Sequence, residues 1–141
     1  MTLPVPIARV RALCSPPDGV DRVQDLLADV WENASHVGPT ERLCFETALV
    51  ELAGNVLAHA HADAGEGLHW EVRIEVDGER IEATVTDDGV ADPVELDDRP
   101  MPDPLAEHGR GLPLIRSLVD GIHYQRLADA NEWRITRKAH P

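Results

Sequence analysis

Three polar side chains recur at four-residue intervals in the otherwise apolar segment 47–59, namely Glu51, Asn55 and His59. Residues four apart on a helix lie nearly above one another, so this spacing predicts one polar stripe on one helical face. A carboxylate, an amide and an imidazole in line are side-chain types from which binding and catalytic sites are built. The same spacing also describes the solvated face of an ordinary amphipathic helix, so the stripe needs support from other motifs.

Two later glycine motifs supply that support. Asp87-Asp88-Gly89 follows an apolar run, where it can place a carboxylate at the edge of a pocket while the glycine lets a flat ligand approach the backbone. Gly109-Arg110-Gly111 precedes a helical pattern, and free N–H groups at a helix start attract anions, to which Arg110 can add a charge. Each motif alone is weak, because Asp-Gly pairs such as Asp77-Gly78 mostly mark turns.

Length and charge narrow the classes of protein that remain. The chain has 141 residues and 43% hydrophobic content, which predicts a single domain, 1–141, with one core. Its formal net charge of -13 argues against a nucleic-acid partner, which is bound through positive surface. Lys138 is the sole lysine, so a lysine-dependent phosphate-binding loop is excluded.

The sequence also favours a cytoplasmic protein with no membrane association. No apolar stretch is long enough to cross a bilayer, and the first residues lack the pattern of a signal peptide. Cys14 and Cys44 show no paired spacing, which favours buried thiols in a reducing compartment over a disulfide or a metal site.

Periodicity predicts an α+β fold with one mainly antiparallel sheet and about three helices on one face. Asp77-Gly78 predicts a hairpin with a primed turn. Ser15 or Asp18 is expected to cap the first helix, and Gly121 to close the last one. The expected elements are a strand over 5–13, helices over 18–33 and 40–60, strands over 68–76 and 80–86, a helix from 111 to 119, and strands over 122–127 and 133–137.

A proline-rich segment separates the two glycine motifs. Prolines at 93, 100, 102 and 104 exclude a regular helix or central strand from about 90 to 108. A connection of this length predicts a functional loop or lid, with a disordered insertion as the alternative.

In order and spacing, these motifs resemble those of the GHKL, or Bergerat-fold, ATP-binding domains, and among them the bacterial anti-sigma factor serine/threonine kinases. The segment 51–59 resembles the N box of that family, Asp87-Asp88-Gly89 its first glycine box, and the segment 107–115 its second. The resemblance covers nearly the whole chain and implies the Bergerat α/β sandwich, with the proline-rich segment as the ATP lid.

The resemblance also implies the ligands, ATP and Mg²⁺, and a role for each site residue. Asn55 would coordinate Mg²⁺, Asp87 would accept a hydrogen bond from the adenine amino group, and Glu51 would act as general base. Gly89 would leave room for the base, and His59 would have a packing or phosphate-shell role. The nucleotide contacts implied for the second box are His108, Gly109, Arg110, Gly111 and Leu112.

One position departs from the family pattern. Ala91 stands where relatives often have a second glycine, which predicts a stiffer lid hinge and altered nucleotide exchange.

The leading hypothesis is a serine/threonine protein kinase that phosphorylates an anti-anti-sigma (STAS-type) partner and sequesters a sigma factor. A non-catalytic ATP-binding module for partner switching is the alternative. The catalytic part of a histidine kinase is less favoured, because the chain before Thr40 is too short for a helical hairpin that carries a phosphoacceptor. A homodimer through the first strand and helix is expected from the resemblance.

Overall fold

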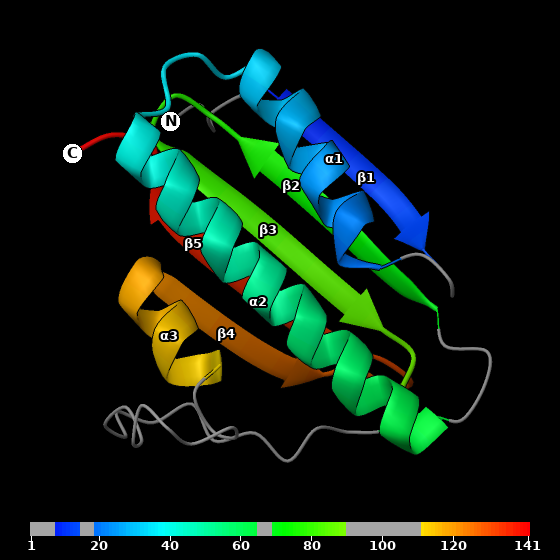
Figure 1. Ribbon diagram of the computed structural model, residues 1–141. Helices are drawn as coiled ribbons and strands as arrows, with labels where there is room; N and C mark the ends of the chain where they lie inside the picture. Colours follow the sequence, from blue (N-terminus) through cyan, green and yellow to red (C-terminus); the bar gives the residue numbers. More distant parts are fainter. Residues whose placement is uncertain (1–7, 15–18, 65–68, 90–110) are drawn as a thin grey trace.

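The computed structural model of the chain describes residues 8–14, 19–64, 69–89 and 111–141 (Figure 1). Its elements are β1 (Ala8–Cys14), α1 (Val20–Glu32), α2 (Pro39–Ala64), β2 (Trp70–Val76), β3 (Arg80–Asp87), α3 (Gly111–Leu118), β4 (Gly121–Arg126) and β5 (Asn131–Lys138). The predicted order of strands and helices along the chain is confirmed.

The strands of the described part form one five-stranded antiparallel sheet in the order β1-β2-β3-β5-β4. Helices α1, α2 and α3 lie side by side on one face of it, with α2 in the middle (Figure 1). The predicted α+β class, with helices on a single face, is therefore confirmed.

The core lies between the sheet and these helices. Alternate residues of β2 are buried, as the two-residue period of a half-covered strand requires. On α2, the apolar stripe Ala48, Leu52 and Val56 is buried, with at most 6% of any side chain exposed. Burial of this stripe fixes the rotation of α2 about its axis, and with it the direction of the polar stripe.

The starts of both long helices differ from expectation. The cap of α1 is Gly19, which makes no side-chain cap hydrogen bond, so neither Ser15 nor Asp18 is the N-cap. Helix α2 begins at Pro39 rather than Thr40, because proline fits the first helical position, where its missing N–H has no helical partner in any case. It continues to Ala64, four residues beyond the predicted end.

The predicted β2–β3 hairpin is confirmed, but the prediction that it contains a primed turn is wrong. Gly78 does not adopt the positive φ that such a turn requires. Instead, the side-chain oxygen Oδ1 of Asp77 accepts hydrogen bonds from the N–H groups of Glu79 and Arg80, at 2.7 and 2.8 Å. An aspartate side chain that bonds the backbone two residues on offers this alternative to a glycine-dependent turn.

The last predicted helix boundary is also corrected. Gly121 is the first residue of β4 and does not close α3. A Cβ atom at this position would lie 2.9 Å from Oγ1 of Thr136, so close strand packing explains the glycine.

Cys44 is a free thiol and is half-buried, so the expected full burial does not hold for it. Within the described ranges, no helix combines the length and apolar character that spanning a bilayer requires.

Candidate functional site

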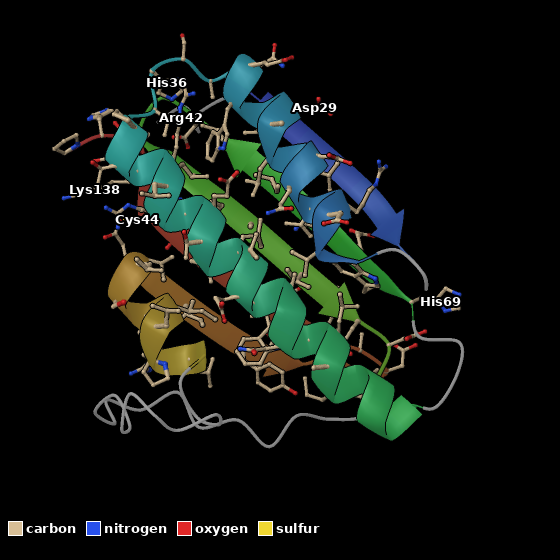
Figure 2. The ribbon with its side chains drawn as sticks, in the orientation of Figure 1. Asp29, His36, Arg42, Cys44, His69 and Lys138 are labelled. Atoms are coloured by element: carbon tan, nitrogen blue, oxygen red, sulfur yellow. The ribbon has the colours of Figure 1, made fainter. Side chains whose placement is uncertain are left out.

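Helix α2 turns the side of Glu51 and Asn55 away from α1. At the start of α2, the Arg42 guanidinium lies over the ring of Trp31 on α1, 5.6 Å from its centroid, and so marks the side that faces α1 (Figure 2). At about 100° per residue, Glu51 lies about half a turn around the helix from Arg42. Helix α3 flanks α2 on the side opposite α1 (Figure 1). The polar stripe therefore borders α3.

Both stripe residues with described side chains are open to a ligand. Glu51 is half-buried and Asn55 is exposed. Among the described residues, neither side chain has a hydrogen bond or ion pair. The side chain of His59 lies outside the described residues, although its backbone is part of α2.

Asp87 ends strand β3 as a buried acid, with 4% of its surface exposed. Its oxygen Oδ1 accepts hydrogen bonds from the N–H of Gly89 at 2.9 Å and from Nδ2 of Asn131 at 3.1 Å. No described residue donates to the other oxygen, Oδ2. This oxygen is thus an acceptor that a ligand amino group can satisfy.

Sequence reasoning missed the residues that hold Asp87. Asn131 is 3% exposed and lies directly opposite Asp87 on β5, whereas the sequence placed it in the connection between the predicted strands 122–127 and 133–137. Its Oδ1 accepts from the hydroxyl of Tyr124 at 2.5 Å and from Nη1 of Arg126 at 3.2 Å. The same Arg126 nitrogen donates to the carbonyl oxygen of Gly89 at 2.7 Å. Only the register of three neighbouring strands reveals this cluster, because Asp87 and Gly89 are far in sequence from the β4–β5 residues that hold them.

The neighbouring acid of the first glycine motif points elsewhere. Asp88 is exposed, and its Oδ1 accepts from the backbone N–H of His69 at 2.8 Å. Its Oδ2 lies 3.1 Å from Nδ1 of the same histidine. Asp88, one residue past β3, thus bonds the residue before β2, whereas Asp87 is buried on the helix-covered side like Ala83 and Val85 of the same strand.

The second glycine motif lies mostly outside the described residues, as do the predicted lid at 90–108 and Ala91. Of its residues, His108, Gly109 and Arg110 are outside, whereas Gly111 is the first residue of α3 and Leu112 is half-buried in its first turn. Helix α3 packs against α2, and Nη1 of Arg137 donates to the Leu118 carbonyl oxygen at its end, at 2.8 Å.

The structure brings these elements together around α2. Helix α2 packs on β3, β5 and α3, and its C-terminal half approaches the end of β3 (Figure 1). Helix α2, which carries Glu51 and Asn55, thus contacts both β3, which ends at Asp87, and α3, which begins at Gly111.

The donor set suits a nucleotide with its own cation. Among the described residues, no group of three or more His, Cys, Asp or Glu side chains could hold a metal ion by itself. Mg²⁺ commonly takes one or two protein ligands together with phosphate oxygens and water. The Asn55 amide and Oδ2 of Asp87, to which no described residue donates, therefore fit a Mg²⁺-bound nucleotide.

The fold and this arrangement define a domain of the GHKL ATP-binding class. The profile of the family described as "Histidine kinase-like ATPase domain" matches residues 15–137, and the chain belongs to this family. Because this is a family of ATPase domains, ATP is the nucleotide that the chain is expected to bind.

Solved structures support the same fold. The RsbU and RsbW domains of Rv1364c from Mycobacterium tuberculosis superpose with a TM-score of 0.61 at 17% identity, over 95% of this chain and 33% of that one. The chain thus spans about a third of that relative. The catalytic domain of histidine kinase ThkA superposes with a TM-score of 0.53 at 13% identity, over 94% of this chain and 97% of that one. No curated protein matches the sequence significantly.

Proposed function

We propose that this protein is an ATP-dependent serine/threonine protein kinase that acts on a regulatory partner of the anti-anti-sigma (STAS) type, in a switch that also sequesters a sigma factor. The observation that carries the proposal is the half-buried carboxylate of Glu51, which has no partner among the described residues and lies one helical turn from the amide of Asn55 on the α3 side of α2. A purely nucleotide-holding site needs no such carboxylate. The RsbW domain among the structural neighbours is consistent with a partner-switching role.

Each described residue has a part that its chemistry permits. Asp87 accepts a hydrogen bond from the nucleobase through Oδ2, and Gly89 presents a surface without a side chain to the ring. Asn55 offers an amide oxygen to Mg²⁺, which neutralises phosphate charge when bound. Glu51 accepts the proton of the partner's hydroxyl as that oxygen attacks. Positioning and charge neutralisation supply most of the acceleration in phosphoryl transfer.

Nucleotide titration tests the binding half of the proposal. Calorimetry with ATP, ADP and AMP, each with and without Mg²⁺, should give affinities that rise with the number of phosphates and depend on the metal for ATP and ADP. The reason is that Asn55 contacts the nucleotide only through the cation, and the start of α3 contacts only the outer phosphates. Equal binding of ATP and AMP, with or without Mg²⁺, would contradict this arrangement.

Phosphate transfer tests the catalytic half. The protein is incubated with Mg²⁺ and γ-labelled ATP together with a STAS-type protein from the same genome, and the labelled product is treated with acid and with alkali. Label on the partner that survives acid and is released by alkali is expected, since phosphoserine and phosphothreonine behave in this way. Acid-labile label on a histidine would instead make the protein a histidine kinase. ATP-dependent capture of the partner without any label would make it a binding module.

A further inference from the structure

We infer that Tyr124, Arg126 and Asn131 form a clamp that fixes the hydrogen-bond polarity of Asp87, so that the site takes a nucleobase with an amino group and rejects one with a carbonyl group at that position. The inference rests on the proposed nucleotide site and deepens it. The clamp belongs to the β4–β5 hairpin, in which Arg126 lies opposite Asn131, and Asn131 in turn lies opposite Asp87 on β3.

The direction of the clamp is set by Arg126. A guanidinium group carries only donors, so the atom of Asn131 that faces Nη1 of Arg126 at 3.2 Å must be the amide oxygen. The hydroxyl of Tyr124, at 2.5 Å from the same oxygen, adds a second donor. With its oxygen held by these two groups, the Asn131 amide must turn its NH₂ towards Asp87.

The orientation of the Asn131 amide in turn determines how the Asp87 carboxylate is bonded. Its Oδ1 receives two donors, the NH₂ of Asn131 and the N–H of Gly89, so it must be an acceptor. Arg126 also donates to the carbonyl oxygen of Gly89 at 2.7 Å, so one guanidinium holds both groups that flank the carboxylate. The carboxylate therefore has a fixed orientation, with Oδ2 as the oxygen left for a ligand.

Packing keeps the clamp in place. Tyr124 lies against Trp133, with ring centroids 4.8 Å apart, and Trp133 is 4% exposed. Tyr124 is thus anchored to the core, while Arg126 reaches in from an exposed position on the edge strand β4. Substitution of Arg126 can therefore loosen the clamp while the core stays intact.

A fixed acceptor selects its ligand by hydrogen-bond complementarity. An amino group at position 6 of a purine donates to Oδ2, whereas a carbonyl oxygen at the same position would face it as a second acceptor. ADP and IDP differ at this position and share the sugar and phosphates. The ratio of their dissociation constants therefore shows whether Asp87 offers an acceptor to position 6 of the base, independently of how tightly the phosphates bind.

The test measures Mg-ADP and Mg-IDP affinities by calorimetry for the wild type, Arg126→Met, Tyr124→Phe and the double variant. We expect the wild type to prefer ADP about 100-fold, the size of a hydrogen bond to a charged group. Each single variant should lower this preference several-fold and the double variant about tenfold, because the two side-chain donors that hold Oδ1 of Asn131 are then removed. Arg134→Ala is the matched control on β5, since Arg134 pairs with Glu132 and takes no part in the clamp.

The outcomes separate this inference from the proposed function. Absence of ADP binding in the wild type would overturn both. ADP binding without preference over IDP, or an unchanged preference in the folded double variant, would overturn the clamp alone. Thermal unfolding monitored by circular dichroism verifies that each variant is folded. If the double variant does not fold, Tyr124→Phe, which removes a single oxygen atom, is used instead. An unchanged ratio of the Mg-ADP and Mg-IDP dissociation constants in that variant would then overturn the clamp.

Discussion

A Glu51→Gln protein should bind Mg-ATP as tightly as the wild type and transfer phosphate to its partner about 10²–10⁴-fold more slowly, the usual contribution of general-base catalysis. Glutamine keeps the size and polarity of the side chain but cannot take up a proton at neutral pH. Glu51 is half-buried and makes no hydrogen bond with another described residue, so the substitution leaves no partner among them without its hydrogen bond. Initial rates of label transfer and calorimetric ATP titration measure the two quantities.

The matched control is Glu46→Gln on the same helix. Glu46 is also half-buried, but at about 100° per residue it lies about 140° around α2 from Glu51 and so faces away from the site. This control should transfer phosphate at the rate of the wild type. If Glu51→Gln did so as well, Glu51 would not be the base, and the transfer would rest on positioning and charge neutralisation alone.

Much of the fold could be predicted because its signals are local. Alternation identified β2 and β3, and the four-residue spacing of Ala48, Leu52 and Val56 identified the buried face of α2. The errors arose where a single residue decides between two local geometries. At the β2–β3 turn, the Asp77 side chain bonds the turn N–H groups, and composition alone does not distinguish this from a glycine-dependent turn.

The site was predictable only in part, for a different physical reason. Motifs that follow one another along the chain, such as the α2 stripe and Asp87-Asp88-Gly89, are visible as spacing. The clamp is visible only in the register, since Asp87, Asn131 and Arg126 meet across three strands. A shift of one residue in the β4–β5 hairpin would turn Asn131 to the other face of the sheet. Polar residues at strand ends acquire their roles from pairing, which no short-range pattern contains.

Asp87→Asn should reverse the base preference rather than merely weaken binding. Asparagine has nearly the shape of aspartate, but one of its two terminal groups is a donor. The N–H of Gly89 and the NH₂ of Asn131 both point at this residue, so its amide oxygen must face them and its NH₂ must face the ligand. Affinity for Mg-ADP should fall about 100-fold, while the affinity for Mg-IDP should fall much less or rise.

Calorimetric titration of both nucleotides with Asp87→Asn measures this reversal, and Asp88→Asn provides the control. Asp88 is exposed, bonds His69 and, among the described residues, makes no hydrogen bond with Asn131, so this second variant should keep the wild-type preference for ADP. Persistent preference for ADP in Asp87→Asn would mean that the amide can turn over against the two donors. Only a rigid pair of donors, one of them from Asn131, prevents the new amide from rotating. Whether the variant prefers Mg-IDP or Mg-ADP therefore shows whether the β4–β5 hairpin determines which base the nucleotide site binds.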